Sequence, residues 1–272
     1  MGKRKQVGTP RRPPICVLTI AGSDSGGGAG VQADARAIRA LGSHALVAIT
    51  AVTAQNTRGV DIWRAVPPAL IERQIAAVLG DFAVGAVKTG LLPGVAAIRA
   101  VARALGRFPR LPLVVDPVIG STSGTQFLPP SGIGAAKRLL FPLADLITPN
   151  WPEAARLARM PVRSAREAAA AAVKILETGC GAVLVKGGHG GGAFCEDILV
   201  TRKGRVRRFA GSRIRTRNTH GTGCVLSSAI AAGLARGRTL EAAVGDARRL
   251  LRKGLRDGRS LGWGKGSGPA LP

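Results

Sequence analysis

The residues best suited to chemistry form a short polar segment, NTHGTGC at residues 218–224, which directly precedes a long apolar stretch. That stretch predicts a helix, so Gly221, Thr222 and Gly223 would carry the unpaired N–H groups of its first turn, where the helix dipole adds about half a positive charge. A cradle of N–H groups binds anions and can stabilise a phosphoryl group during its transfer. A glycine-rich helix start without a ligand has the same pattern, so this segment alone leaves both interpretations open.

Acidic residues are scarce, with 15 Asp plus Glu in 272 residues, so those that follow predicted strands stand out. Asp116 ends an apolar run just before a proline, and Glu153 begins a predicted helix. Both could hold Mg²⁺ through oxygen ligands and water. A turn-forming Asp and an acid at a helix N-terminus would have the same pattern. Asp34, early in the first predicted helix, could either complement the helix dipole or bind a substrate.

These residues fall in the loops of a repeating strand and helix pattern. Continuous apolar runs, typical of strands buried on both faces, alternate with stretches of helical periodicity, which predicts βαβ units and a mostly parallel sheet. The predicted strands are 15–21, 45–52, 83–87, 113–116, 144–148 and 182–186, and the predicted helices are 31–41, 68–79, 94–106, 152–159, 164–178, 222–235 and 239–256. Residues 193–209 predict a hairpin appended to this sheet, with its turn at Lys203-Gly204. Ligands of such sheets bind beyond the carboxyl ends of the strands, where these loops gather.

The chain shows no polar linker that would divide it. We therefore predict a flexible basic tail at residues 1–14, a single domain at 15–260 and a flexible tail at 261–272. No apolar run reaches the length of about 18 residues that a membrane span requires. The four cysteines form no C-x-x-C pair, so we expect a reduced, cytoplasmic protein without a structural metal.

The chain is strongly basic, with 40 Lys plus Arg and a net charge of +25. The densest basic stretch, residues 202–217, could bind a nucleic acid through its phosphates. Only six Phe, three Trp and no Tyr are present, which leaves few side chains on which single-stranded bases could stack. A solvated hairpin explains the same charge, and a basic surface also favours a small phosphorylated substrate.

Several common nucleotide-binding and catalytic motifs are missing or incomplete. Residues 28–33, GAGVQA, fit the dinucleotide pattern G-x-G-x-x-A, but the position where an acid should follow is Thr53, which makes a dehydrogenase a weak interpretation. The sequence contains no G-x-x-x-x-G-K-[ST] and no G-x-S-x-G. A Walker-type ATPase and a hydrolase with a nucleophile elbow are therefore excluded.

Six sequence blocks closely resemble the hydroxymethylpyrimidine/phosphomethylpyrimidine kinases of thiamine biosynthesis, members of the ribokinase-like superfamily. The blocks are TIAGSDSGGGAGVQAD (19–34), ITAVTAQNTRGV (49–60), VVDPV (114–118), LITPNWPEA (146–154), VLVKGGH (183–189) and NTHGTGC (218–224). The resemblance implies an α/β, ribokinase-like three-layer sandwich. It also implies an ATP- and Mg²⁺-dependent kinase that phosphorylates 4-amino-5-hydroxymethyl-2-methylpyrimidine and then its monophosphate. A pyridoxine or pyridoxal kinase on the same fold is the alternative, and a nucleic-acid-binding protein is a more distant one.

The resemblance further implies roles for individual residues. The pyrimidine would be bound by Gly22, Asp34, Gln55, Leu91 and Val118, with Leu91 standing where the family usually has Met. ATP would be bound by Asn150, Lys186, Gly187 and Gly188, and Mg²⁺ by Asp116 and Glu153. Gly221, Thr222 and Gly223 would form the anion hole for the transferred group.

Cys224 stands where most of the superfamily has an Asp that acts as base. A helix N-terminus lowers the pKa of a thiol from about 8.5, so the resemblance implies a thiolate that accepts the proton of the hydroxymethyl group. We interpret Cys16, Cys180 and Cys195 as structural thiols. An exposed sheet edge in this fold favours a homodimer.

Overall fold

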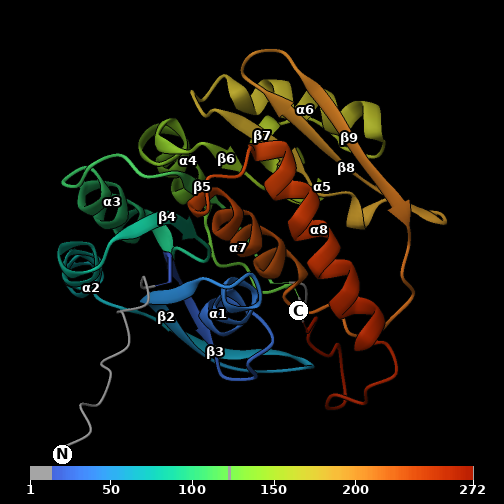
Figure 1. The fold of residues 1–272 in the computed structure, drawn as a ribbon, viewed down its shortest axis with the longest axis horizontal. Coiled ribbons are helices and arrows are strands. Elements are labelled where there is room, and N and C mark those ends of the chain that lie inside the picture. The colour runs from blue at the N-terminus through green and yellow to red at the C-terminus, as the bar shows by residue number, and fades with distance from the viewer. Residues whose placement is uncertain (1–13, 122–123, 272) are drawn as a thin grey trace, which may run out of the picture.

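The computed structural model describes residues 14–121 and 124–271. Within them, nine strands form one sheet in the order β3-β2-β1-β4-β5-β6-β7-β8-β9 (Figure 1). The strands are β1 (Cys16–Asp24), β2 (His44–Asn56), β3 (Gly59–Ala65), β4 (Val84–Thr89), β5 (Leu113–Val115), β6 (Leu146–Ile147), β7 (Ala182–Val185), β8 (Phe194–Thr201) and β9 (Val206–Ser212). The six central strands are parallel, and β3, β8 and β9 pair antiparallel at the two ends.

Helices cover both faces of the sheet (Figure 1). One layer contains α1 (Gly30–Ala40), α7 (Thr222–Ala235) and α8 (Leu240–Asp257), and the other contains α2 (Pro68–Asp81), α3 (Gly94–Leu105), α4 (Pro130–Leu139), α5 (Trp151–Ala158) and α6 (Ala165–Leu176). Short 3₁₀ turns, η1 (Phe141–Leu143) and η2 (Gly187–His189), follow α4 and β7. The predicted three-layer α/β class with a mostly parallel sheet is confirmed.

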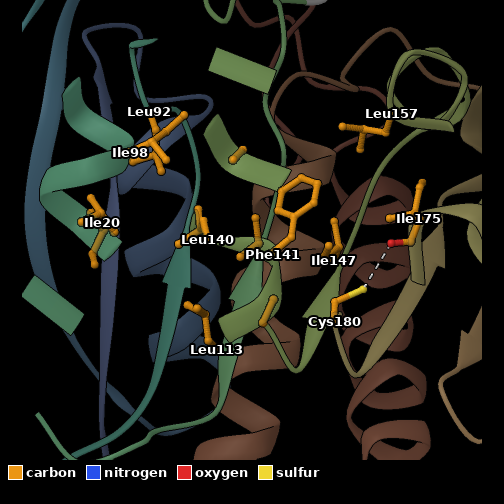
Figure 2. Packing of buried hydrophobic residues seen from close by; sticks show 14 of the residues in the cluster. Ile20, Leu92, Ile98, Leu113, Leu140, Phe141, Ile147, Leu157, Ile175 and Cys180 are labelled. Carbon is orange, nitrogen blue, oxygen red and sulfur yellow. Dashed lines mark hydrogen bonds between the residues drawn. The ribbon is translucent and has the colours of Figure 1, made fainter. Parts of the chain in front are cut away.

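The apolar runs that predicted the strands are buried on both faces of the sheet. Figure 2 shows one of the two large clusters, in which Phe141 packs beside Leu140 and Ile147. Burial of each such side chain stabilises the fold by about 1.5–3 kcal/mol. In the same cluster the thiol of Cys180 is buried and donates to the carbonyl oxygen of Ile175 at 3.9 Å, as we expected for a structural thiol.

Two elements were not predicted from the sequence, β3 and α4. Most residues of β3 are exposed, so the strand lacks the apolar pattern of the buried ones, and it forms because β2 continues through a tight turn. The helix α4 begins at Pro130 and contains Gly132 and Gly134, a composition typical of a loop. Proline is tolerated in the first helical turn, and burial of Ala135 and Ala136 stabilises the helix.

The predicted hairpin at residues 193–209 is confirmed as β8 and β9, and Gly204 adopts a φ of 76° in the turn between them. The strand β9 is the last of the sheet, and Arg207 and Arg208 on it are exposed. Arg208 lies 3.7 Å from Glu196, and the guanidinium of Arg207 lies 5.2 Å from the centre of the Phe209 ring. In the part of the chain that the structure describes, no helix is long and apolar enough to cross a membrane.

Residues 264–270, which we call the C-terminal segment, return to the body of the protein after α8 (Figure 1). The N–H of His220 donates to the carbonyl oxygen of Gly268 at 3.0 Å, and the N–H of Ser267 donates to that of Thr57 at 2.9 Å. A Cβ added at Gly266 would lie 2.0 Å from the carbonyl oxygen of Thr57, so the contact requires glycine.

The C-terminal segment differs from the flexible tail that we predicted at residues 261–272. The sequence here is polar and rich in glycine, which is typical of a tail, but its glycines allow the backbone to pair closely with two loops. The basic tail predicted at residues 1–14 lies outside the described residues except for Pro14.

Candidate active site

A buried ion pair lies beneath the loops at the carboxyl ends of the strands. Lys88, near the end of β4, donates to the two carboxylate oxygens of Asp34 at 2.8 and 2.7 Å, and neither side chain has any exposed surface. The hydroxyl groups of Thr19 and Ser228 donate to the same carboxylate at 2.6 and 2.7 Å. Asp34 therefore joins α1 to β1, β4 and α7.

This position contradicts the predicted contact between Asp34 and the pyrimidine, because four protein hydrogen bonds occupy its carboxylate and none of it is exposed. Burial disfavours the charged form of Lys88, but Asp34, Cys224 and Asp116 outweigh that effect and raise its pKa. Lys88 therefore stays charged beneath the site, where it is paired with Asp34. Lys88 was not among the predicted site residues, although a lysine at the end of an apolar strand was a signal for it.

A second cluster of charges joins Asp116, Lys186 and Glu153. The Nζ atom of Lys186 lies 2.8 Å from Asp116 and 4.0 Å from Glu153, so it bridges the loops after β5, β6 and β7. Thr148 and Ser227 donate to the two carboxylate oxygens of Asp116 at 3.2 and 3.3 Å. Burial alone would raise the pKa of Asp116, but Lys186 and Lys88 hold it below its usual range.

Asn150 and Glu153 form a capping box at the start of α5. The Asn150 side chain accepts from the N–H of Glu153 at 2.9 Å, and the Glu153 carboxylate accepts from the N–H of Asn150 at 2.8 Å. The sequence left open whether Glu153 caps a helix or faces a ligand, and the geometry allows both, because the carboxylate also faces Lys186. Burial raises the pKa of Glu153 to about 7, with Lys186 opposing the increase and Asp116 adding to it.

The carboxylates of Asp116 and Glu153 offer oxygen ligands to a divalent cation. The described residues contain no group of three or more His, Cys, Asp or Glu side chains that could hold a metal ion alone. Magnesium commonly binds to proteins through one or two carboxylates and takes its other ligands from phosphates and water. Two acids on either side of Lys186 fit that mode of binding.

The first turn of α7 lies directly on the cluster of Asp116 and Lys186. A Cβ added at Gly223 would lie 3.0 Å from Lys186 Nζ and 3.5 Å from a carboxylate oxygen of Asp116. Among the described residues, the N–H groups of Gly223 and Cys224 find no hydrogen-bond acceptor. These free donors and the helix dipole, next to the ammonium group of Lys186, make a cradle that favours an anion.

Gly221 precedes this turn as the N-cap, with a φ of 76°. A Cβ added there would lie 2.0 Å from the carbonyl oxygen of Gly28, in the loop after β1. Any other residue would therefore meet both backbone strain and a collision. Gly221 thus fixes the distance between the cradle and the loop after β1, while Thr222 opens the helix.

Cys224 completes the first turn of α7. The prediction that the pKa of its thiol is lowered is wrong. Burial raises the pKa of the thiol to about 11, Lys88 acts in the opposite direction, and Asp34 and Asp116 add to the increase. The expectation of a lowered pKa considered only the helix N-terminus and not the two carboxylates that the fold brings near the sulfur. Cys224 is therefore a neutral thiol at neutral pH.

Gln55 lies in a polar group with His220 and Asp24. The Nε2 atom of His220 lies 3.0 Å from both a carboxylate oxygen of Asp24 and the amide nitrogen of Gln55. Asp24 also accepts from the N–H groups of Gly26 and Ala29, and its pKa is lowered because these bonds and His220 outweigh burial. Neither His220 nor Asp24 was among the site residues predicted from the sequence.

Three of the predicted pyrimidine contacts come together on the apolar side of the site. A Cβ added at Gly22 would lie 2.8 Å from Leu91, so these two residues touch. Leu91 belongs to a small cluster with Ala51 and Phe127, against which Val118 packs. A flat ring could lie between this apolar cluster and the polar group around Gln55.

The predicted ATP residues after β7 differ in their surroundings. The N–H of Gly187 donates to Asp197 at 2.7 Å, and a Cβ there would lie 2.0 Å from the carbonyl oxygen of Glu196, so Gly187 is fixed against β8. A Cβ at Gly188 would meet nothing within 4 Å. Gly188 is thus open to a ligand, whereas Gly187 acts by packing.

Comparison with known proteins shows similarity to one family over most of the chain. A family model described as phosphomethylpyrimidine kinase matches residues 24–270. The hydroxymethylpyrimidine/phosphomethylpyrimidine kinase of Rhizobium meliloti (strain 1021) is 46% identical over 253 residues, which cover 93% of this chain and 94% of that protein. The chain also matches bifunctional thiamine biosynthesis proteins, of which it spans about half the length, 53% for that of Geobacter sulfurreducens.

Solved structures show the same similarity. The phosphomethylpyrimidine kinase of Clostridium difficile 630 is 37% identical, with a TM-score of 0.77, over 88% of this chain and 98% of that one. The pyridoxal kinase of Bacillus subtilis, solved as an ADP complex, is 31% identical, with a TM-score of 0.81, over 89% of this chain and 91% of that one.

Proposed function

The chain belongs to the phosphomethylpyrimidine kinase family, and from that premise we propose that it phosphorylates 4-amino-5-hydroxymethyl-2-methylpyrimidine with ATP. We propose further that it phosphorylates the resulting monophosphate to the pyrophosphate, as a step of thiamine biosynthesis. The observation that carries this proposal is the first turn of α7, where Gly223 lies beside Lys186 and Asp116 and the N–H groups of Gly223 and Cys224 find no acceptor among the described residues. A phosphoryl group in transfer needs such a preorganised positive cradle.

The cradle lies between two groups of residues that suit the two substrates. On one side, Gly22, Leu91 and Val118 offer an apolar surface, and Gln55 offers an amide to the ring nitrogen and amino group of a pyrimidine. On the other side, the loops of Asn150 and of Lys186 to Gly188 would bind ATP. The transferred group would therefore cross the N-terminus of α7.

Lys186 would exchange partners when ATP binds. Its ammonium group pairs with Asp116 at 2.8 Å, and the phosphates would compete for that charge. Asp116 and Glu153 would then hold Mg²⁺, which neutralises phosphate charge when bound. The fixed charge of Lys88 beneath the site would stay with Asp34.

Removal of the hydroxymethyl proton is the proposed role of Cys224. Only the thiolate can accept a proton, and a pKa of about 11 leaves roughly one thiolate in 10,000 molecules at pH 7. The proposal therefore requires turnover that increases with pH.

A panel of acceptors tests the proposed function. Purified protein with ATP and Mg²⁺ would be given the hydroxymethylpyrimidine, its monophosphate, pyridoxine and pyridoxal, and the products would be scored as mono- or diphosphorylated. Both pyrimidines should react, with higher kcat/KM than either vitamin. Turnover of pyridoxal alone would instead support the pyridoxal kinase alternative, and no turnover of any acceptor would refute a kinase of either kind.

Three predictions concern the surroundings of the enzyme. We propose a homodimer, since Val52 on β2 and Ile62 on β3 are 54% and 46% exposed. We also propose a cytoplasmic location. Nucleic-acid binding by residues 202–217 stays a prediction from charge. Salt-dependent retention of RNA or duplex DNA at physiological ionic strength would support it.

A further inference from the structure

Arg213, which follows β9, inserts its guanidinium group into the loop after β7. Its Nη1 atom donates to the carbonyl oxygen of Gly188 at 2.9 Å and its Nε atom donates to that of Gly192 at 3.1 Å. Its Nη2 atom donates to Gly190 and, at 3.5 Å, to Phe194. The main-chain N–H of Arg213 donates to Ala193 at 2.7 Å. One side chain therefore gathers three carbonyl groups of a single loop and that of Phe194, the first residue of β8.

The loop that Arg213 gathers, residues 187–192, has the sequence GGHGGG, and we call it the glycine loop. Glycine loses more conformational freedom on ordering than any other residue, so five glycines in six positions need an outside restraint to keep one shape. Gly187 is packed against β8, and the side chain of Trp151 lies 3.0 Å from where a Cβ of Gly190 would be. Hydrogen bonds from Arg213 restrain the rest of the glycine loop.

The charge of Arg213 is not used in an ion pair. Among the described residues, no carboxylate lies within 4.0 Å of its guanidinium nitrogens. The side chain is half-buried, and its donors are directed to main-chain oxygens. Because these oxygens point toward Arg213, their negative ends are turned away from the outer side of the loop.

The N–H groups on the outer side of the loop remain free. In the described part of the chain, those of Gly188 and Gly191 find no acceptor, and a Cβ at either position would meet no atom within 4 Å. Backbone N–H groups in open glycine-rich loops bind phosphate oxygens. Lys186, which directly precedes the loop, holds its ammonium group 2.8 Å from Asp116, beside the first turn of α7.

We propose that Arg213 is a positioning residue of the nucleotide site, which holds the glycine loop with its N–H groups directed at the phosphates of ATP. The inference rests on the proposed function in assigning residues 186–188 to ATP. Arg213 itself would not touch the nucleotide. Its effect would be confined to the nucleotide side, because its hydrogen bonds reach neither Gln55 nor Leu91.

The test compares Arg213→Ala and Arg213→Lys with a matched control, Arg252→Ala. Arg252 also donates to main chain near the end of β9, to the carbonyl oxygen of Ser212 at 2.8 Å, but not to the glycine loop. The Kd for ADP would be measured by calorimetry, and the KM values for ATP and for the pyrimidine would be measured separately. Guanidinium chloride at millimolar concentration would be added to Arg213→Ala to restore the missing group.

We expect Arg213→Ala to raise the Kd for ADP and the KM for ATP by about tenfold, the effect of losing a few hydrogen bonds. The KM for the pyrimidine should stay within about twofold. Added guanidinium should recover part of the affinity for ADP, and Arg213→Lys should be intermediate, because one ammonium group cannot reach all four carbonyls. Arg252→Ala should resemble the wild type.

An unchanged Kd for ADP in Arg213→Ala, or an equal rise of both KM values, would overturn the inference. A variant that fails to fold would be replaced by Arg213→Lys, in which the same Kd comparison applies. Because ADP binding is measured directly, the outcome is independent of the acceptor. A wild type that binds ADP but phosphorylates no pyrimidine would refute the proposed function and leave the test of Arg213 intact.

Discussion

Replacement of Asp34 should damage stability rather than recognition of the pyrimidine. The carboxylate is fully buried and receives two hydrogen bonds from Lys88 and one each from Thr19 and Ser228. Asp34→Asn removes the negative charge and leaves the ammonium group of Lys88 buried without a counter-charge. Loss of one partner from a buried ion pair costs about 3–5 kcal/mol, a large part of the 5–15 kcal/mol by which domains are typically stable.

The matched variants separate charge from shape. Lys88→Met should lower the free energy of unfolding by a similar amount, because it leaves the carboxylate of Asp34 buried without a counter-charge. The double variant, Asp34→Asn with Lys88→Met, buries no charge. We therefore expect the double variant to lose at least about 2 kcal/mol less than the two single losses added together. Asp61→Asn changes an exposed acid on β3 whose carboxylate has no hydrogen-bond partner among the described residues, and it should change stability by less than about 0.5 kcal/mol.

Urea unfolding at pH 7, followed by circular dichroism, gives the free energies for this cycle, and steady-state kinetics gives the KM for the pyrimidine. If Asp34 bound the pyrimidine directly, Asp34→Asn would keep its stability within about 0.5 kcal/mol and raise that KM. Additive losses in the cycle would also refute the reasoning, since they would mean that Lys88 and Asp34 do not depend on each other.

Three further changes test other parts of the site. Cys224→Ala should lower kcat by at least about 100-fold with ADP binding retained. Wild-type turnover should rise about tenfold per pH unit from pH 7 to 9, because the pKa of the thiol is about 11. A flat pH profile would remove Cys224 as the base. Since the pKa of Glu153 is raised from 4.5 to about 7, the stability from its protonated form is full below pH 4.5 and is lost as the pH rises through 7. Glu153→Gln should therefore gain roughly 2–3 kcal/mol over the wild type between pH 5 and pH 8 in urea unfolding, and equal pH dependence would contradict this. In Gly266→Ala the new Cβ would lie 2.0 Å from the carbonyl oxygen of Thr57. This variant should release the C-terminal segment to limited proteolysis and raise the KM for the pyrimidine several-fold. Gly262→Ala, in which the Cβ meets open space, should do neither.

The sequence predicts the layers of this fold well because strands that are buried on both faces are continuous apolar runs in the sequence. Strands such as β1 and β7 are buried along almost their whole length, and helical periodicity marks the helices between them. The glycines of the cradle could also be recognised from the sequence, since Gly221 is a position where only glycine fits. Where an element depends on its neighbours instead, as β3 depends on β2, the local sequence carries little signal.

The electrostatics of the site could not be predicted in the same way. Cys224 and Asp34 are 190 positions apart in the chain, and only the packing of α1 against α7 places that carboxylate near the thiol. The role of Arg213 depends likewise on the hairpin folding back over the glycine loop. Charge interactions between distant segments are set by tertiary structure, so a motif identifies a group but not its protonation state.

Among the residues that the structure describes, β9 is the last strand of the sheet, and one row of its main-chain donors and acceptors has no neighbouring strand. Such an open margin is a template on which a second molecule could add a strand, and charged side chains discourage that addition. Arg207 and Arg208 stand on β9 and are exposed. The arginines that give this region its resemblance to a polyanion-binding surface would also repel an identical strand, and so protect a concentrated solution of the enzyme from assembling into fibrils.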